Sequence, residues 1–563
     1  MGRFVKIIDY QTAPRDVPEF VDVLVVGSGP AGLTVAAELA GTGLRVLVVE
    51  SGGVTEDSGD PFETDSVGSP RIEPESRVRT RALGGTSEVW SGRCTPLDDI
   101  DFEKRDWVAD SGWPIEPRDL EGHLARAATY FSLGSQQYGA GLWPQLGIPG
   151  TGAALDPRLL TERFWHFSRG VVVPAEPTRF GTDISAAVTV LVGATVVRLD
   201  ASDGDVQAVQ AVRLADRSGR TSILAVGTVV IAAGAIETPR LLLASGLGNN
   251  NTGRYFMDHP GAVIASIDLA DASAVRNRFG IYWKKAKPFR LAFMNGIALA
   301  AAVQRSEKLL NAAAWLDEYP SAEDPWQAAL RIVRRLRGES TTPEQNLAEF
   351  WRARTGANAV TRSMAADVRA VLAHPLLLVQ GMLRLRRRRP PLYLPERIDL
   401  YALVEQVPDP ESRITLSDRV DARGMPVPRI DWRLHPEEFE TMKRLGELVT
   451  AEFARVGLPE PVPVPWMVDF DSWKTHVLDR AHQIGTARMG STAETGVVDL
   501  DCRVFGLTNV FVAGSSVFPT SGHANPTLMI VALAIRLADH LAQLHIRSAA
   551  GPRVVQETLE KIE

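Results

Sequence analysis

Short, almost entirely apolar runs occur near the start, in the middle and near the end of the chain. Val21 to Val26 and Leu44 to Val49 are two such runs, and small and apolar residues from Ala31 to Ala40 separate them. Short valine-rich runs are typical of parallel strands buried on both faces, and the stretch between them is expected to be a helix. Similar runs return within 227–246 and at 509–514. We therefore predict an α/β domain whose sheet collects strands from three separate parts of the chain.

The segment between these runs has a different pattern. Residues 306–389 have largely helical periodicity, as in DPWQAALRIVRRLRG, where apolar residues fall on one face. Residues 398–418 and 427–431 are predicted strands, interrupted by the turn-forming stretches PDPES and ARGMP. No glycine-rich phosphate loop accompanies them. This segment is expected to form an α+β substrate domain, with an antiparallel or mixed sheet and a helical insertion at 306–389.

The two domains are predicted to be interleaved. At 563 residues the chain is longer than one hydrophobic core usually supports. The nucleotide-binding domain is assigned to residues 15–105, 176–265 and 471–548, and the substrate domain to residues 106–175, as a cap, and 266–470.

Composition and charge narrow the class of protein. The chain is 45% hydrophobic and 23% charged, and its net charge of −7 argues against a general nucleic-acid-binding role. Cys94 and Cys502 lie far apart and in no CxxC pattern, so neither a metal site nor a disulfide framework is indicated. The N-terminal residues contain no apolar signal segment, and the cytoplasm is the expected location.

One arginine-rich stretch raises the question of membrane contact. The apolar run Ala370 to Leu383 is too short to cross a bilayer and continues into RLRRRRPP. Arginines at Arg384 to Arg389 could rest on an anionic membrane surface or partner. A solvated helix end followed by a proline stop is the favoured alternative.

A glycine-rich turn joins the first predicted strand to the first helix. Gly27, Gly29 and Gly32 form GxGxxG, and Glu50 ends the second strand. In such a motif the glycines allow a tight turn, a close approach of a pyrophosphate, and close packing of helix on strand, while the helix N-terminus binds the anion. A carboxylate at Glu50 can accept hydrogen bonds from a ribose diol. These features predict a dinucleotide site without choosing between FAD and NAD.

Four separated segments resemble the glucose-methanol-choline (GMC) family of flavin oxidoreductases. In chain order they are VVGSGPAGLTVAAELAGTGLRVLVVESG, RALGGTSEVWSG, GRYFMDHPG, and a final block that begins AHQIGTARMGS and contains PTSGHANPTLMIVALAIRLADHL. The final block is most similar to pyranose 2-oxidases and bacterial glycoside oxidoreductases. The resemblance implies a Rossmann-like FAD-binding domain, and it does not extend to residues 306–389.

The resemblance also implies which residues hold FAD. They are Gly27, Gly29, Gly32 and Glu50 at the ADP part, Val197 at the adenine side, Gly84, Gly85, Thr86, Trp90 and Ser91 along the flavin, and Gly514, Ser515, Asn525, Pro526 and Thr527 around the isoalloxazine. In several pyranose oxidases a histidine just before the tryptophan of the flavin loop is covalently joined to the flavin. Val89 occupies that position here, so the FAD is expected to be noncovalent.

In this family an alcohol gives its O–H proton to the histidine of an HxxGT motif and its C–H hydrogen, as hydride, to flavin N5. His482 holds the histidine position, and Asn525 stands where a second histidine or asparagine completes the pair. An alcohol has a pKa near that of water, about 15.7, against about 6.5 for histidine, so a separate proton transfer would cost on the order of 12 kcal/mol. Loss of the proton and of the hydride is therefore expected to be coupled.

Each catalytic assignment has a structural alternative. Taken alone, His482 could be an ordinary histidine beside a Gly-Thr turn, and Asn525 followed by Pro526 could simply cap the last helix. His523 is a weaker candidate for the same pocket. His259 matches a structural turn of the family, and no catalytic role is expected for it.

The favoured function is oxidation of a CH–OH group of a sugar, glycoside or cyclitol to a carbonyl. One alternative is oxidation of a sterol or other apolar alcohol, for which the tryptophan-containing segment Val464 to Trp473 could serve. The other alternative is a flavin-binding protein without turnover. Oxygen or another electron acceptor would reoxidise the flavin. The acceptor is left open, because no motif separates an oxidase from a dehydrogenase. No nucleic-acid partner is expected, and membrane contact is the less favoured hypothesis.

Overall fold

Valine-rich strands from three parts of the chain pair into one sheet, as their apolar pattern predicts. In this computed structural model the strands of the sheet have the order β1-β7-β3-β2-β10-β9-β8. The structure describes all residues except 1–5, 56–59, 72–77, 89, 149–151, 169–187, 205–206, 271, 287–288, 338–362, 387–392 and 550–563. The neighbouring strands β1, β7, β3, β2 and β10 are parallel, and β19 pairs in parallel with β10. Strand β9 runs antiparallel to both β10 and β8. The strands are β1 (Lys6–Asp9), β2 (Phe20–Val26), β3 (Val46–Glu50), β7 (Thr189–Val192), β8 (Thr195–Ala201), β9 (Val209–Ala215), β10 (Thr221–Ile231) and β19 (Val510–Val512).

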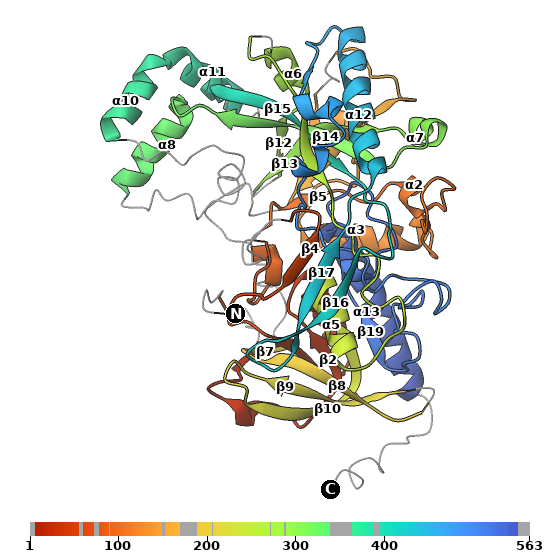
Figure 1. Cartoon of the computed structure of the whole chain (residues 1–563). Coiled ribbons are helices and arrows are strands. Elements are labelled where there is room, and N and C mark those ends of the chain that lie inside the picture. The colour runs from red at the N-terminus through yellow and green to blue at the C-terminus, as the bar shows by residue number, and fades with distance from the viewer. Residues whose placement is uncertain are drawn as a thin grey trace.

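Three helices cover this first sheet. Helix α1 (Pro30–Leu39) leads from β2 to β3. Helix α5 (Gly234–Ala244) follows β10 (Figure 1). Helix α13 (Thr527–Ala549) packs against α1 and against α3 (Glu121–Tyr130). By length and composition α13 could cross a membrane, but 56% of its apolar window is buried inside the protein. It is therefore explained as a core helix of the first domain.

A second sheet forms the other half of the body. Its order is β18-β11-β15-β14-β13-β6-β5, with β12 paired to β13, and every pair in it is antiparallel. The strands are β5 (Arg93–Cys94), β6 (Leu160–Phe167), β11 (Gly261–Ser266), β12 (Ile281–Ala286), β13 (Phe289–Leu299), β14 (Ala312–Pro320), β15 (Pro395–Val404) and β18 (Val462–Pro463). The helices of this half are α2 (Asp99–Phe102), α4 (Leu142–Leu146), α6 (Ala272–Arg278), α7 (Ala301–Glu307) and α12 (Pro436–Arg455). The predicted α/β fold with a second α+β domain is confirmed.

Three strands differ from the sequence-based prediction. The expectation of a largely helical segment at 306–389 is wrong at Ala312–Pro320, which forms strand β14 between β13 and β15. Its alanine-rich sequence favours a helix locally, but pairing on both edges in the sheet overrides this weak preference. Strands β16 (Arg413–Val420) and β17 (Pro426–Trp432) do not join the second sheet. They form a separate three-stranded sheet, in which β17 lies between β16 and β4 (Asp65–Gly68), and they lie against α5.

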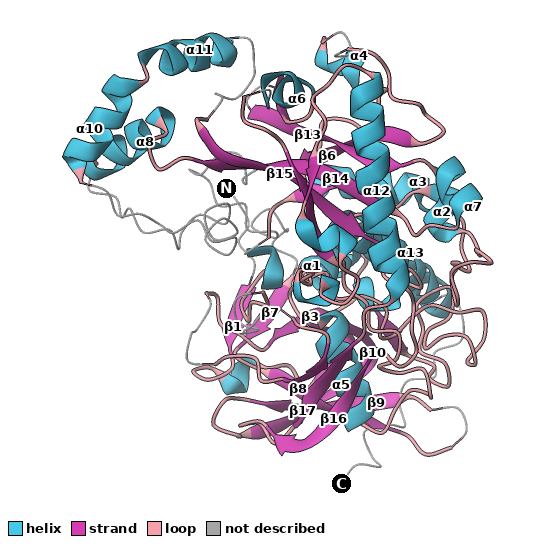
Figure 2. Cartoon of the chain, turned by 45° about the horizontal axis from the view of Figure 1, so that its top comes forward, coloured by secondary structure: helices cyan, strands magenta, loops and turns pink. Residues whose placement is uncertain are grey.

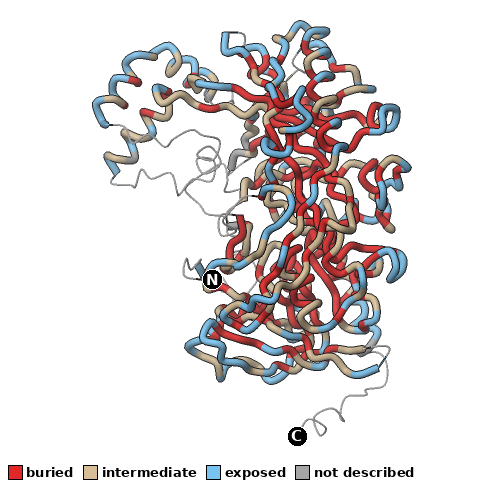
Figure 3. The backbone as a smooth tube through the Cα atoms, viewed as in Figure 1, coloured by how far each residue is buried: buried red, intermediate tan, exposed pale blue. Residues whose placement is uncertain are grey.

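The remaining predicted helices form an arm that projects from the body. Helices α8 (Pro325–Leu336), α10 (Met364–Ala373) and α11 (Pro375–Arg386) lie to one side of the second sheet (Figures 1 and 2). The arm has its own internal contacts, since the buried carboxylate of Asp367 accepts hydrogen bonds from Arg331 and Arg335, both at 2.7 Å. Most of the body is coloured as buried in Figure 3, whereas much of the arm is not.

Candidate active site

One large cavity lies where the two sheets meet. Its volume is about 1140 Å³, above the roughly 300–1,000 Å³ that is usual for small-molecule sites. Residues from β2, β3 and α5 line one end, and residues from β11, β14 and β15 line the other. The cavity can therefore hold a large cofactor at the first sheet and a substrate at the second.

The glycines of the GxGxxG turn have the geometry that their spacing predicts. Gly27 has φ +103°, and a Cβ on it would lie 2.6 Å from the carbonyl oxygen of Ala232. A Cβ on Gly32 would lie 2.0 Å from the oxygen of Gly27, so helix α1 could not pack this closely on β2 with any larger residue. Gly29 lines the cavity, and no protein atom lies within 4 Å of its ideal Cβ position. The open space at Gly29 and the free N-terminus of α1 fit a pyrophosphate.

Glu50 lies at the end of β3 and lines the same end of the cavity. Its carboxylate accepts hydrogen bonds from the N–H and hydroxyl of Ser28, at 3.0 and 2.6 Å, and from the N–H of Gly52 at 2.8 Å. A fourth contact, from the Ser51 hydroxyl, is longer at 3.4 Å. Because an ionised carboxylate has about four acceptor positions, a ribose hydroxyl can replace that weakest contact.

The predicted flavin residues form two loops that face one another across the cavity. Gly85, Thr86, Trp90 and Ser91 come from one loop, and Gly514, Ser515, Pro526 and Thr527 come from the other; all of these residues line the cavity. Gly84 lies behind the wall, where its N–H donates to the carbonyl oxygen of Ser28 at 3.2 Å. Val89 lies outside the described residues, so noncovalent attachment of FAD remains a prediction.

Val197, like Gly32 and Gly84, is a predicted cofactor residue that does not itself line the cavity. Its neighbours Thr195 and Val196 line the cavity, whereas Val197 is partly buried against the core of the first domain. An irregularity in the pairing of β8 with β9 falls between Val196 and Arg198, where it shifts the direction of the side chains. The structure therefore favours Val196 over Val197 as the residue of this strand that faces the cofactor.

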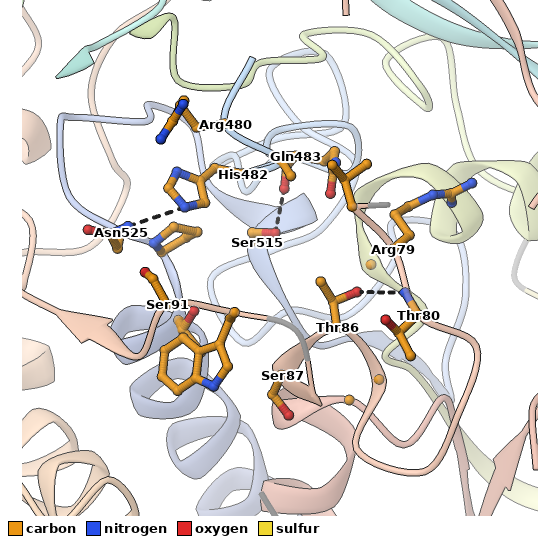
Figure 4. Close-up of a pocket in the computed structure, with 18 of the residues that line it drawn as sticks. Arg79, Thr80, Thr86, Ser87, Ser91, Arg480, His482, Gln483, Ser515 and Asn525 are labelled. Atoms are coloured by element: carbon orange, nitrogen blue, oxygen red, sulfur yellow. Dashed lines mark hydrogen bonds between the residues drawn. The ribbon is translucent and has the colours of Figure 1, made fainter. Parts of the chain in front are cut away.

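His482 and Asn525 meet inside the cavity, as predicted. The side-chain amide of Asn525 donates a hydrogen bond to Nε2 of His482 at 3.2 Å (Figure 4). Helix α13 begins at Thr527, and the N–H of Ile530 donates to the carbonyl oxygen of Pro526 at 2.9 Å. The first helical hydrogen bond therefore starts at Pro526, and the Asn525 amide is directed to the histidine.

His259 holds His482 from the opposite side. Their Nδ1 atoms are 2.9 Å apart, and Nε2 of His259 lies 2.8 Å from the carbonyl oxygen of Gly522. A carbonyl oxygen only accepts, so Nε2 of His259 carries a proton; burial lowers the pKa of His259 to about 4, which keeps its Nδ1 an acceptor. The Nδ1–H of His482 must then donate to His259. This leaves Nε2 of His482 as an unprotonated nitrogen in the cavity, the form that a general base requires.

Asp258 orients the backbone on which both histidines lie. Its Oδ1 accepts from the N–H groups of His259 at 2.7 Å, Arg480 at 2.9 Å and His482 at 3.0 Å. Ala481, between the last two, has φ +60°, a left-handed conformation that is strained for alanine. The three hydrogen bonds hold this strained turn and so fix the direction of the His482 side chain.

The local charges keep His482 neutral and shape the titration of Asp258. Burial lowers the pKa of His482 well below its ordinary value, and the neighbouring His259, Arg480 and Arg93 lower it further. Burial and the nearby Asp479 raise the pKa of Asp258 to about 7. The Oδ2 of Asp258 is buried without a hydrogen-bond partner. A proton on Oδ2 therefore leaves Oδ1 able to accept hydrogen bonds, so Oδ1 is an acceptor whether the carboxyl group is protonated or ionised.

The other histidines considered from the sequence have different outcomes. Nε2 of His523 donates to the carboxylate of Asp98 at 3.1 Å, and His523 is not part of the cavity wall, so the structure does not support it as a catalytic candidate. His259 was expected to be structural only, and its contact with His482 was missed. The signal that could have pointed to it is the position of MDHP inside a family-like segment. Among the described residues, no group of three His, Cys, Asp or Glu side chains could hold a metal ion.

Comparisons with known proteins agree with this site. Residues 176–261 and 408–534 match two family models described as GMC oxidoreductase, and residues 22–58 match a model described as FAD binding domain. These matches make the protein an FAD-dependent oxidoreductase acting on alcohol or sugar-like CH–OH donors. The chain carries both the N-terminal and the C-terminal regions of the GMC oxidoreductases.

The sequence identity between this chain and individual relatives is low. The chain is 22% identical to a 2-methyl-1,2-propanediol dehydrogenase from Mycolicibacterium austroafricanum, over 93% of the chain and 95% of that protein. It is 32% identical to a C-glycoside 3-oxidase from Arthrobacter globiformis, but over only 26% of the chain and 28% of that protein. Among solved structures, Aspergillus oryzae formate oxidase has a TM-score of 0.51 at 18% identity, covering 94% of the chain and 99% of the oxidase. A fungal aryl-alcohol oxidase has a TM-score of 0.51 at 16% identity, covering 94% and 100%, so both structures support the fold.

Proposed function

We propose that this protein oxidises a CH–OH group of a sugar, glycoside or cyclitol to a carbonyl, with His482 as the general base. The observation that carries the proposal is the unprotonated Nε2 of His482, held in the cavity between His259 and Asn525. His482 lines the cavity, where a bound alcohol can reach its side chain. A bound alcohol can take the place of the Asn525 contact, so that its oxygen accepts from the amide while its O–H donates to Nε2.

FAD would supply the acceptor for the hydride that leaves the carbinol carbon. The residues that would hold it are the GxGxxG turn and Glu50 at one end, and the two loops around Thr86 and Ser515 at the other. The hydroxyl of Ser515 donates to the carbonyl oxygen of Gln483 at 2.6 Å, which ties the predicted flavin loop to the segment that carries His482. Neutral His482 takes the alcohol proton, and the Asn525 amide stabilises negative charge on the oxygen as the carbonyl forms.

A polar substrate is supported by the side chains around His482. Arg93, Asp317 and Arg480 line the substrate end of the cavity together with Tyr401. Burying these charged groups against a sterol would be costly. Trp473, one of the residues that could have served an apolar substrate, is instead buried against Phe439 in the core, with ring centroids 5.8 Å apart. The diol and C-glycoside named for two relatives are consistent with a hydroxyl-rich substrate.

The experiment that tests the proposal is anaerobic mixing of the yellow holoprotein with matched sugars, glycosides, cyclitols and sterols while the flavin absorbance is followed. We expect bleaching by at least one hydroxyl-rich compound and none by sterols. Admission of air then distinguishes an oxidase, whose colour returns quickly, from a dehydrogenase. Absence of bleaching by every alcohol would reject the proposal. Retention of FAD through denaturing precipitation would reject noncovalent binding.

A further inference from the structure

Two arginines flank the catalytic histidine on a pair of aromatic rings. The guanidinium of Arg93, on β5, lies 4.7 Å from the ring centre of Trp315, and that of Arg480 lies 4.7 Å from the ring centre of Tyr401. The rings of Trp315 and Tyr401 are themselves 5.2 Å apart. All four residues line the substrate end of the cavity, and Figure 4 places Arg480 beside His482. The aromatic pair therefore holds two positive charges at the reaction centre.

Arg93 differs from other arginines of this cavity in its lack of a counterion. Arg276 is paired with Glu318, and Arg397 with Asp399 at 2.9 Å. Within the described part of the chain Arg93 forms no ion pair, and its Nε is buried without a hydrogen-bond partner. Asp317 acts on it only over a longer distance, and burial lowers the pKa of Arg93. A buried charge of this kind is costly unless a ligand compensates it.

We propose that the alcohol oxidised by this protein carries an anionic group, a carboxylate or a phosphate ester, that binds between Arg93 and Arg480 beside His482. The proposal rests on the function proposed above and names its substrate class. A guanidinium fork suits either anion, since both offer paired oxygens to parallel N–H donors. The neutral hydroxyl to be oxidised would then reach Nε2 of His482 and the Asn525 amide.

The same arrangement links substrate binding to the strength of the base. Arg93 and Arg480 both lower the pKa of His482. An anion bound between them offsets these charges and raises the pKa of His482 in the complex. The base therefore gains proton affinity when an anionic alcohol is bound, and a neutral alcohol does not provide this gain.

The test uses matched alcohols that differ in charge: glucose, glucuronate and glucose 6-phosphate, and glycerol, glycerate and glycerol 3-phosphate. Anaerobic flavin reduction gives the Kd and the limiting rate for each. We expect the Kd of at least one anionic alcohol to be at least about tenfold lower than the Kd of its neutral partner. Arg93→Gln should raise that Kd at least about tenfold and raise the Kd of the neutral partner much less, and Arg93→Lys should recover part of the loss. The carboxylate and phosphate arms identify which anion is bound.

Two outcomes would overturn this assignment in different ways. In the first, neutral alcohols bind more tightly than anionic ones, and Arg93→Gln slows the reduction of flavin by both kinds of alcohol equally. This result would mean that Arg93 acts only through His482, and the proposed function would stand. No reduction by any alcohol would reject the proposed function and the anionic substrate together. Arg276→Gln is the matched control, because Arg276 lines the cavity but is already neutralised by Glu318.

The projecting arm carries a second, independent inference. Large apolar side chains on α8, α10 and α11 are exposed to solvent, with Leu336, Leu372 and Leu376 each about three-quarters exposed at 76%, 74% and 76%. The others are Leu330, Val333, Met364, Val368, Val379, Met382 and Leu383. These three helices contain six arginines and a single acidic residue, Asp367, in a chain whose net charge is −7. The arm is therefore both apolar and locally cationic.

We propose that this arm docks on the surface of an anionic phospholipid bilayer. Apolar side chains beside arginines are the composition of helices that lie in a membrane interface. Helices α10 and α11 together are apolar enough to pass as a membrane segment, but they are bent by 75° at their junction, which suits a shallow contact better than a crossing. A symmetric pair of arms from two copies would bring two cationic faces together, which disfavours a second copy as the occupant.

Docking would place the entrance of the cavity at the membrane. Arg384, on α11, lines the cavity and donates to the side-chain oxygen of Asn277 at 3.2 Å. The arm thus borders the same space that leads to His482. Substrates or electron acceptors held at a lipid surface would meet this entrance directly.

Vesicle flotation tests the docking. The full-length holoprotein should bind vesicles of phosphatidylcholine with 30% phosphatidylglycerol, bind pure phosphatidylcholine weakly, and lose binding in high salt. Leu372→Glu with Leu376→Glu should reduce binding at least about tenfold at unchanged FAD content. Ile223→Glu, at a site 70% exposed on β10 in the first domain, is the control and should change nothing. Absence of binding to anionic vesicles, or a solution dimer that the double variant dissociates, would overturn the proposal.

Discussion

The Nδ1 atoms of His259 and His482 lie 2.9 Å apart, and this contact decides which nitrogen of His482 faces the substrate. Nε2 of His259 donates to a backbone carbonyl, so its Nδ1 accepts and Nδ1 of His482 must donate. The consequence is an unprotonated Nε2 of His482 at the cavity, where it accepts from the Asn525 amide. A neighbour that never touches the substrate thereby prepares the base.

Replacing His259 with Phe tests this positioning role. Without an acceptor at Nδ1, the tautomer with a proton on Nε2 competes, so we expect flavin reduction to slow by on the order of tenfold or more while FAD content stays unchanged. The ¹⁵N shifts of His482 should change from one tautomer to a mixture. His166→Phe is the control, because His166 is a buried histidine packed on Tyr138 that does not itself line the cavity. Equal effects of the two replacements would reduce His259 to a packing residue.

The pH dependence of reduction should reflect the lowered pKa of His482. A base is active when unprotonated, so its activity is present above its pKa and is lost as the pH falls through it. Because burial, His259, Arg480 and Arg93 hold this pKa well below the ordinary value of about 6.5, the limiting rate should stay level from pH 8 to below pH 6.5. Arg93→Gln should move the acidic limb to higher pH. A wild-type rate that halves near pH 6.5 would show that the site does not depress the pKa.

Asp258 should contribute more through its acceptor oxygen than through its charge. Asp258→Ala removes the acceptor of three backbone N–H groups, and we expect it to lower the free energy of unfolding by about 3 kcal/mol or more. Asp258→Asn keeps Oδ1 and should cost less than half as much. Urea unfolding of the two variants provides the comparison. If Asn proved as damaging as Ala, the negative charge would be the important property.

Much of this site could be predicted because its residues lie in local motifs. The GxGxxG turn, the end of β3 and the HxxGT segment are each determined by a few neighbouring residues, and the structure brings them into one cavity. The contact between His259 and His482 could not be predicted, since it joins residues 223 positions apart and needs the turn that Asp258 holds. Strand β14 was missed because an alanine-rich stretch shows its sheet pairing only through β13 and β15. The bulge that turns Val197 away from the cavity likewise depends on the partner strand β9.

Two glycines of the dinucleotide turn should separate cofactor binding from folding. Gly29→Ala meets no protein atom within 4 Å, so the protein should fold normally yet lose affinity for FAD by at least about tenfold, because the methyl group would enter the pyrophosphate space. Gly32→Ala would place a Cβ 2.0 Å from the Gly27 oxygen and should lower the thermal stability of the FAD-free protein as well. FAD titration and melting of both apoproteins test this difference. Normal FAD affinity in Gly29→Ala would move the pyrophosphate elsewhere.

The central claim is that Nε2 of His482 takes the alcohol proton, and His482→Ala tests it most directly. The measurement is the rate of anaerobic flavin reduction by the best alcohol found for the wild type, in a variant shown to bind a full complement of FAD. The account predicts a rate lower by about 10²-fold or more, the usual contribution of a positioned base. A rate within a few-fold of the wild type, with FAD bound, would contradict it.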